Sequence, residues 1–314
     1  MAVKYREFKF HSHADKLEIH AMTVAPEAKI IGVVQILHGM CEHKERYYDF
    51  MKYLAEKGYL CVIHDHRGHG SSVVSDADLG YFYDAGYDGL IEDAHQVTEL
   101  IKESVGDVPY ILLGHSMGSF ITRNYLFRYG TGIQGAIICG TGSQPGVVVK
   151  FSRALAAFQG LLFGEKHTAK LIDKLAFGNY NKQVEKQRTS FDWLCRDEAV
   201  VDAYIADELC GFTFTVNGFR TLFTLLDRLN KEENLKKMPE TLPVLFIAGE
   251  KDPVGNYGEG VKKAFRDFQK AGLTTLSMKL YPEDRHELLN ELDKEKVYED
   301  IYSWMLERIK EYQL

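Results

Sequence analysis

The hydrophobic and polar positions of this chain follow two kinds of pattern in turn along most of its length. Short apolar runs typical of strands occur near residues 16–25, 30–37, 59–64, 108–113, 133–139, 243–248 and 276–281. Segments with apolar residues at helical spacing lie between most of them, at about 44–57, 86–104, 117–129, 257–271 and 294–312. This alternation predicts an α/β fold, with a mostly parallel central sheet and helices on both faces.

The N-terminal segment, residues 1–10, alternates polar and apolar residues, which is typical of an edge strand. It has no continuous apolar stretch of the kind found in a signal peptide. We expect the first two strands, which precede any helix, to form an antiparallel edge of the sheet.

One long region interrupts the alternation of strands and helices. From Ser143 to about Met238 no convincing buried strand is found, and the pattern is mainly helical. We therefore divide the chain into an α/β core, residues 1–142 and 239–314, and an inserted helical lid, residues 143–238. No window approaches the ~20 apolar residues that a membrane span needs, and the most apolar stretch, 154–163, is too short.

One transition from strand to helix contains the pentapeptide Gly114-His115-Ser116-Met117-Gly118. A G-x-S-x-G sequence in this context predicts a nucleophile elbow, a strained turn that exposes a serine hydroxyl at the carboxyl end of a sheet. The glycines let the neighbouring strand and helix approach, and the helix N-terminus favours a developing negative charge. We therefore predict that Ser116 is a catalytic nucleophile.

A serine nucleophile needs a base to accept its proton and an acid to orient that base. In this architecture the acid and then a histidine follow the serine along the chain. Only His167 and His286 come after Ser116. His286 follows the last predicted strand, in a loop where a general base is expected, whereas His167 follows no strand. We predict that His286 is the base and that His167 is solvated.

The acid is predicted in the loop after the strand at 243–248. Asp252 is preferred to Glu250 because the loop turns directly after it, at a proline. For Glu250 we expect a loop hydrogen bond. Glu283 and Asp284 stand beside the predicted base, but sequence neighbours rarely face each other, so both are expected to be solvated.

Negative charge on a substrate oxygen needs fixed hydrogen-bond donors, each worth about 2.7–4 kcal/mol of transition-state stabilisation. In this fold the donors are two backbone N–H groups, one directly after the nucleophile and one in an upstream strand-to-helix loop. The first is that of Met117. The second is predicted to be that of Met40, in the loop after residues 30–37, where Gly39 lets the backbone approach the substrate.

Four motifs also carry a likeness to a known family. They are His38-Gly39-Met40 with Glu42-His43 and Arg46-Tyr47, Asp65-His66-Arg67-Gly68-His69-Gly70-Ser71-Ser72, the Gly114–Gly118 pentapeptide, and the loop Glu250–Gly255. With them the chain resembles serine hydrolases of the monoacylglycerol lipase and lysophospholipase type, a group also described as serine aminopeptidase-like. The likeness covers the chain apart from its middle. It implies an α/β-hydrolase fold with a lid, ester hydrolysis on acyl-bearing substrates, and a triad of Ser116, Asp252 and His286.

A separate run, His64-Asp65-His66-Arg67-Gly68-His69, contains residue types that can bind zinc. Arg67 would place a positive charge among the ligands, and a catalytic zinc needs a third ligand and an open position that nothing here identifies. We expect instead that Asp65 and Arg67 lock this loop through hydrogen bonds near the carboxyl edge of the sheet. We predict no metal and no cofactor.

Composition adds only broad limits. The 314 residues, 45% hydrophobic and 26% charged, suit a globular enzyme with one core and an insertion. A formal net charge of -7 argues against a nucleic-acid partner. The cysteine count of five is odd and contains no C-x-x-C pair, so free thiols in a reducing, cytoplasmic compartment are expected.

These features together predict a serine carboxylic-ester hydrolase that acts on a single-chain acyl ester, a monoacylglycerol or a lysophospholipid, through an acyl-enzyme. The lid is expected to line an apolar acyl pocket, with Phe158 and Leu162 among the substrate-binding residues and residues 154–163 in transient contact with a membrane surface. A thioesterase, a peptidase acting on small N-terminal residues and a ligand-binding protein on the same fold are the alternatives. The sequence leaves the oligomeric state open.

Overall fold

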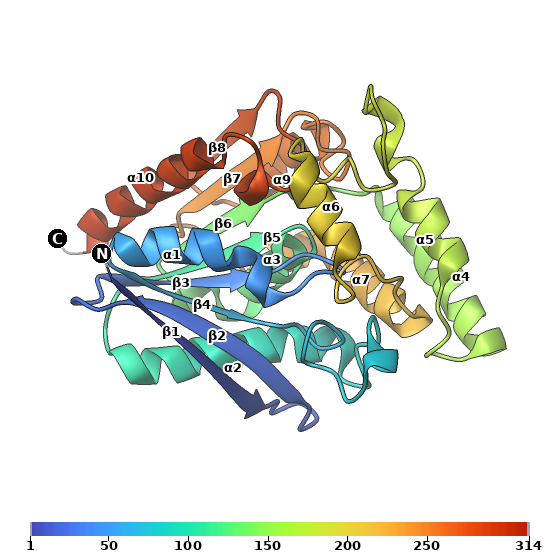
Figure 1. Ribbon diagram of the computed structural model, residues 1–314, viewed down its shortest axis with the longest axis horizontal. Helices are drawn as coiled ribbons and strands as arrows, with labels where there is room; N and C mark the ends of the chain where they lie inside the picture. Colours follow the sequence, from blue (N-terminus) through green and yellow to red (C-terminus); the bar gives the residue numbers. More distant parts are fainter. Residues whose placement is uncertain (1, 313–314) are drawn as a thin grey trace.

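The computed structural model describes residues 2–312, which form a central sheet with helices on both faces and a helical insertion at one end (Figure 1). In these residues the sheet has eight strands in the order β1-β2-β4-β3-β5-β6-β7-β8. Their bounds are β1 Val3–His11, β2 Glu18–Pro26, β3 Gly32–Leu37, β4 Tyr59–His64, β5 Tyr110–His115, β6 Gly135–Cys139, β7 Val244–Gly249 and β8 Leu276–Tyr281.

The sheet is mostly parallel, as the sequence predicts. β1 pairs antiparallel with β2, and β2 pairs antiparallel with β4, whereas all other neighbouring strands are parallel. The antiparallel edge is therefore β1 and β2. The expectation is wrong for β3, which also precedes any helix but lies in the middle of the sheet, between β4 and β5. All residues of β3 are buried, because helices cover both of its faces.

Helices follow most strands. Those of the core are α1 Tyr48–Glu56, α2 Gly86–Val105, α3 Met117–Tyr129, α9 Glu259–Lys270 and α10 Lys294–Tyr312. Those of the insertion are α4 Gly146–Phe163, α5 Lys170–Phe177, α6 Glu198–Ala206, α7 Val216–Leu229 and α8 Glu232–Leu235. Short 3-10 turns are η1 Lys44–Tyr47, η2 Asp76–Asp78, η3 Gly130–Gly132, η4 Tyr180–Gln183 and η5 Leu288–Asn290.

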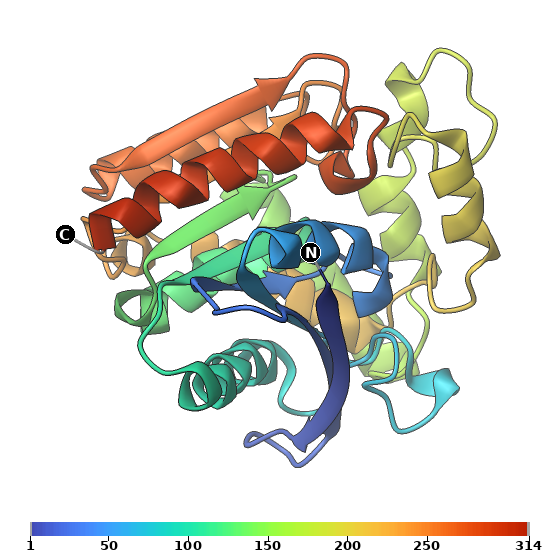
Figure 2. The ribbon, with the colours of Figure 1, turned by 60° about the vertical axis from the view of Figure 1, so that its left-hand side comes forward.

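The two faces of the sheet build two apolar cores. Side chains of α1 and α10 share one cluster with Ile111 and Leu113 of β5, and Figure 2 shows α10 lying across this face. Side chains of α2, α3 and α9 share the other cluster with Tyr110 and Leu112. Because successive residues of a strand point to opposite faces, β5 contributes to both cores in turn. This double burial holds the carboxyl end of β5 in place.

The insertion continues the second of these cores. Phe214, Phe219 and Leu225 of the insertion belong to the same buried cluster as α2 and α3. α4 packs along α7, with Val149 and Ala156 buried between them. The insertion thus rests on the core at the edge where the parallel strands end (Figure 1).

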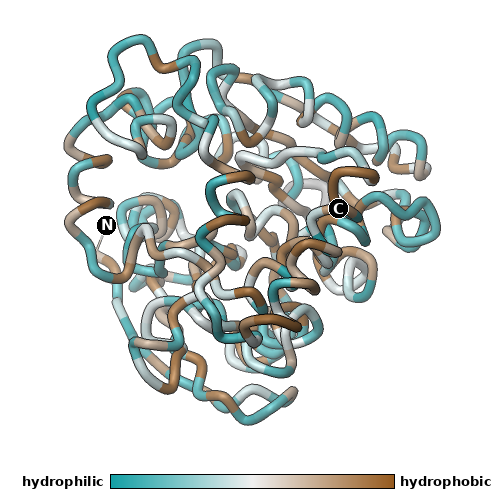
Figure 3. Tube along the Cα trace, turned by 90° about the vertical axis from the view of Figure 1, so that its right-hand side faces the viewer, coloured by the Kyte–Doolittle hydropathy of each residue, from teal (hydrophilic) through white to brown (hydrophobic). Residues whose placement is uncertain are grey.

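α4 corrects one expectation from the sequence. Residues 146–163 form one continuous helix that is long and apolar enough to cross a membrane by length and composition, with a mean hydropathy of 1.4 and 17% of its residues buried. In the sequence, Lys150 and Arg153 interrupt the apolar residues, so the apolar stretch looks shorter than the helix that contains it. Arg153 pairs with Asp227 of α7 at 2.8 Å, so one side of α4 faces the protein. In Figure 3, which faces the side where α4 and α5 lie, brown hydrophobic stretches are interspersed with teal hydrophilic ones.

Candidate active site

Ser116 lies at the sharp turn between β5 and α3. Its backbone has φ 54° and ψ −119°, a region that non-glycine residues rarely adopt and that is common at functional sites. Its neighbours must be glycine: a Cβ on Gly118 would lie 1.9 Å from the carbonyl oxygen of Leu37, and one on Gly114 would lie 2.2 Å from that of Gly118. The N–H of Ser116 donates to the carbonyl of Cys139 at 3.0 Å. The close backbone packing at the two glycines and the hydrogen bond to Cys139 fix the turn at the carboxyl end of β5.

The loops after β7 and β8 bring Asp252 and His286 together. Nδ1 of His286 lies 2.9 Å from Oδ2 of Asp252, whose Oδ1 accepts the N–H of Val254 at 2.8 Å. Both side chains are buried. Burial alone lowers the pKa of His286, but the carboxylate of Asp252 outweighs it and raises this pKa above its ordinary value. With Nδ1 donating to Asp252, Nε2 is left free to accept a proton.

Ser116, His286, Gly39, Met40 and Met117 all line one cavity of about 810 Å³. Gly39 approaches the serine closely, because a Cβ on it would lie 3.2 Å from Cβ of Ser116. Met117 is the first residue of α3, so its N–H has no partner within the helix. The structure thus gathers at one cavity the predicted nucleophile, base and oxyanion donors.

Most of the remaining cavity wall is apolar and comes from the insertion. It includes Val148, Phe151, Leu155, Ile172, Leu175, Phe177, Trp193, Leu194, Phe212, Leu222, Phe223 and Leu226. The Trp193 ring lies 5.2 Å from that of His286. The sequence does not predict this contact with His286, because no local pattern places residues of the insertion beside the base.

Comparison with known proteins agrees with this geometry. A family model described as serine aminopeptidase, S33, matches residues 28–293. The chain belongs to this family.

Relatives and solved structures place the enzyme more narrowly. A monoacylglycerol lipase of Mycolicibacterium smegmatis is 27% identical over 90% of this chain and 91% of its own length. A monoglyceride lipase of Rattus norvegicus is 24% identical over 98% of this chain and 93% of its own. The crystal structure of a thermostable carboxyl esterase from Bacillus coagulans, in complex with glycerol, superposes with a TM-score of 0.90 at 30% identity, covering 97% of this chain and 99% of that one. This member of the S33 family is a carboxylic-ester hydrolase with the α/β-hydrolase fold.

Two predicted substrate-binding residues of this hydrolase lie outside the cavity wall. Phe158 and Leu162 are 58% and 56% exposed, whereas α4 contributes Phe151 and Leu155 to the wall. All four share one face of the helix, since they are spaced by three or four residues. Phe158 and Leu162 lie one and two turns beyond Leu155, and the cavity ends before them. Phe158 and Leu162 thus lie on the face of α4 that lines the cavity, but beyond the part of the helix that forms its wall.

The other residues weighed for the catalytic roles lie apart from this cavity wall. Glu250, Glu283 and His167 are exposed. Asp284 differs from the expectation that it is solvated: it is buried and pairs with Arg196 of the insertion at 2.5 Å. Burial, followed by nearby carboxylates, raises the pKa of Asp284 to about 7. Its partner is distant in sequence, which is why local reasoning missed the pair.

The histidine-rich loop after β4 is packed inside the hydrolase. Asp65 accepts hydrogen bonds from the backbone of Lys44 and Ser71 and from Nζ of Lys44. Arg67 is fully buried and pairs with Asp93 at 2.9 Å. Asp65 and Arg67 therefore hold this loop separately, each through its own partners.

Two groups of side chains in the described part of the chain have the spacing of metal ligands, with ligand atoms within 4.8 Å: His43-Asp207-Cys210 and Asp284-Glu291-Asp293. The second group already holds a cationic group of the protein. Arg196 pairs with all three carboxylates of the second group. In the first, the ring nitrogens of His43 lie 2.5 Å from Glu45 and 2.8 Å from Asp207. Burial lowers the pKa of His43, but hydrogen bonds with Cys210, Glu45 and Asp207 raise it to about 11.

Proposed function

We propose that this hydrolase cleaves single-chain acyl esters, of the monoacylglycerol or lysophospholipid type, through a serine acyl-enzyme. The observation that carries the proposal is the cavity of about 810 Å³ that joins Ser116 to an apolar wall. Its volume lies in the range of small-molecule sites, which are mostly apolar with a few polar groups. The relatives that are monoacylglycerol lipases support the same substrate class.

In the proposed mechanism Ser116 attacks the acyl carbonyl while Nε2 of His286 takes its proton. Asp252 keeps the proton on Nδ1 and stabilises the imidazolium that forms, which agrees with the raised pKa of His286. The N–H groups of Met40 and Met117 hold the oxyanion. His286 then returns its proton to the leaving alcohol, and water releases the acyl group by the same path.

We further propose that residues 143–238 act as a lid over this site. The wall that they supply keeps water from the reacting carbonyl, which strengthens the hydrogen bonds to the oxyanion. The same residues set the length and shape of the acyl chain that fits, since most of the apolar wall is theirs.

α4 is the proposed contact with a lipid surface. Phe151 lines the cavity and is 69% exposed, and Phe158 and Leu162 continue its stripe outward along the same helix face. A lipid that leaves a membrane or micelle would meet apolar side chains along this whole path. The contact is transient in this proposal, because the other side of α4 packs against α7.

The location of the enzyme and its lack of nucleic-acid partners and cofactors stay predictions. All five cysteines are free and buried, which supports a reducing compartment such as the cytoplasm.

The test is hydrolysis of a p-nitrophenyl ester series from short to long acyl chains. Activity should rise with chain length, and Ser116→Ala should lower kcat about 10⁶-fold. Ser152→Ala removes a second hydroxyl from the same cavity wall and should keep activity, which makes it the matched control. Labelling by a fluorophosphonate should likewise need Ser116. A short-chain optimum would refute the lipid substrate, and turnover that persists in Ser116→Ala would refute the mechanism.

A further inference from the structure

Glu42 is a buried carboxylate in the same loop as the proposed oxyanion donor Met40. Its Oε1 accepts the N–H of Gly39 at 2.6 Å and the hydroxyl of Tyr47 at 2.8 Å. Its Oε2 accepts a hydrogen bond from Nη1 of Arg46 at 2.6 Å. A Cβ on Gly39 would lie 2.6 Å from Oε1 of Glu42, so this close approach needs glycine. Three donors therefore fix the carboxylate, and the carboxylate in turn fixes the N–H side of Gly39.

The carbonyl side of Gly39 is fixed by His38. The backbone N–H of His66 donates to Nε2 of His38 at 2.9 Å, so Nε2 carries no proton. In the neutral ring the proton is then on Nδ1, which lies 2.8 Å from the carbonyl oxygen of Gly39 and donates to it. In a trans peptide the N–H of the next residue points opposite to that carbonyl. The direction of the Met40 N–H is therefore set by contacts at both sides of Gly39.

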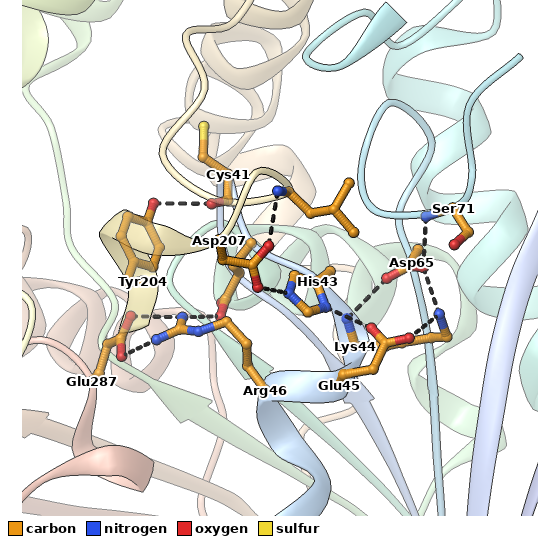
Figure 4. Close-up of polar contacts among 12 residues, drawn as sticks. Cys41, His43, Lys44, Glu45, Arg46, Asp65, Ser71, Tyr204, Asp207 and Glu287 are labelled. Carbon is orange, nitrogen blue, oxygen red and sulfur yellow. Dashed lines mark hydrogen bonds and ion pairs between the residues drawn. The ribbon is translucent and has the colours of Figure 1, made fainter. Parts of the chain in front are cut away.

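Arg46 connects Glu42 to the loop of the catalytic base. Its guanidinium donates to both carboxylate oxygens of Glu287 at 2.8 and 2.6 Å (Figure 4). Glu287 follows His286 directly in the chain, and both line the cavity. Bidentate pairs between arginine and a carboxylate fix geometry as well as adding energy. Glu42 and Glu287 thus share one arginine, between the oxyanion loop and the base loop.

We propose that Glu42 is a positioning residue: it holds the N–H of Gly39 and so helps to fix the direction of the following Gly39–Met40 peptide toward the oxyanion, and it is tied through Arg46 to the loop of His286. The inference rests on the proposed function. Gly39 has no side chain to restrict its own dihedral angles, so a fixed external acceptor supplies that restriction. Donors that are already in place need no reorganisation during the reaction. Glu42 should therefore act on the transition state and leave binding of the acyl chain unchanged.

The experiment compares Glu42→Ala and Glu42→Gln with the wild type on a long-chain p-nitrophenyl ester. We expect Glu42→Ala to lower kcat about 10²–10³-fold, as for loss of one oxyanion donor, with KM unchanged. Glu42→Gln keeps an oxygen for the N–H of Gly39 but turns its NH₂ toward Arg46, so a smaller loss, about tenfold, is expected. The isosteric variant also carries the test if the alanine variant fails to fold.

A second measurement separates positioning from general structural damage. A long-chain trifluoromethyl ketone forms a tetrahedral oxyanion with the serine, so its affinity should fall in parallel with kcat. The affinity of the fatty-acid product, which makes no such adduct, should not change. Glu45→Gln makes the same substitution at a half-exposed carboxylate that bonds to His43 and Lys44 instead, and it should keep the wild-type kcat.

The outcomes also separate this inference from the function on which it rests. A kcat for Glu42→Ala close to that of the wild type would overturn the positioning role while leaving Ser116 essential. Equal weakening of ketone and fatty acid, or a raised KM at unchanged kcat, would overturn it as well. Turnover that does not depend on Ser116 would instead overturn the proposed function itself.

Discussion

Replacing Asp252 by asparagine keeps the shape of the residue but removes its charge, and we expect kcat to fall about 10⁴-fold. Asp252 is fully buried, with one oxygen 2.9 Å from Nδ1 of His286 and the other 2.8 Å from the N–H of Val254. Asparagine has only one oxygen for these two positions. Either arrangement of its amide therefore places an NH₂ group where an acceptor is needed.

The magnitude follows from the two contacts that the variant loses. If the oxygen stays on Val254, the NH₂ faces Nδ1 and the ring protonates on Nε2, where it cannot take the serine proton. If the amide turns over, the buried N–H of Val254 loses its acceptor, at a cost of ~1–3 kcal/mol. Loss of the charge also removes on the order of 4–6 kcal/mol of attraction to the imidazolium, for charges ~3–4 Å apart at an effective dielectric near 20.

At about 1.36 kcal/mol per tenfold change, the lost attraction alone is worth about three to four decades, and the tautomer penalty brings the total to four or more. The assay is the pH profile of kcat on a long-chain ester. In the wild type, activity should fall as pH drops through the raised pKa of His286, because only the neutral ring is a base. In Asp252→Asn the plateau should drop and the acid limb should move to lower pH. Glu250→Gln, at an exposed position in the same loop, is the control.

A loss of less than about tenfold in Asp252→Asn would refute this reasoning, as would an acid limb that stays in place.

Three further predictions concern other parts of the enzyme. Gly118→Ala places its Cβ 1.9 Å from the carbonyl oxygen of Leu37, a backbone atom that cannot move aside, so urea unfolding should show a loss of at least ~3 kcal/mol in the free energy of unfolding. Gly132→Ala, where only the end of a lysine lies 3.5 Å away, should lower the free energy of unfolding far less. Equal losses in the two variants would contradict the steric explanation. Phe158→Asp should weaken binding to anionic vesicles and hydrolysis of micellar esters but leave hydrolysis of monomeric esters unchanged. Phe151→Asp should impair hydrolysis of both micellar and monomeric esters. Loss of activity on monomeric esters in both variants would show that Phe158 also acts at the cavity. The pKa of His43, about 11 in the folded state, exceeds its ordinary value, so the contribution of its charge to stability is complete below about pH 6.5 and is lost as pH rises toward 11. His43→Gln should therefore lower the free energy of unfolding at pH 7 and flatten the decline of this free energy between pH 7 and 10. An unchanged decline in chemical unfolding would exclude the charged form of His43.

The sequence predicts those features of the structure that depend on residues close together in the chain. The parallel sheet and the elbow follow from strand, turn and helix patterns that are adjacent in the chain. The acid and base follow from chain order. The pairs of Arg46 with Glu287 and of Arg196 with Asp284 join residues far apart in sequence, so no periodicity signals them. The exposure of Phe158 and Leu162 depends on where the cavity ends along α4, which the phase of a helix does not determine.

The division of the cavity between core and insertion has a consequence for how this enzyme can diverge. The elbow tolerates almost no change, because backbone atoms occupy the space around Gly114 and Gly118. The apolar wall of the cavity comes mostly from residues 143–238, which form no part of the central sheet. Substitutions in α4, α5 and α7 can therefore change substrate preference during evolution while the catalytic residues stay the same. Paralogues of this enzyme should therefore differ most in the apolar cavity wall and least around Ser116.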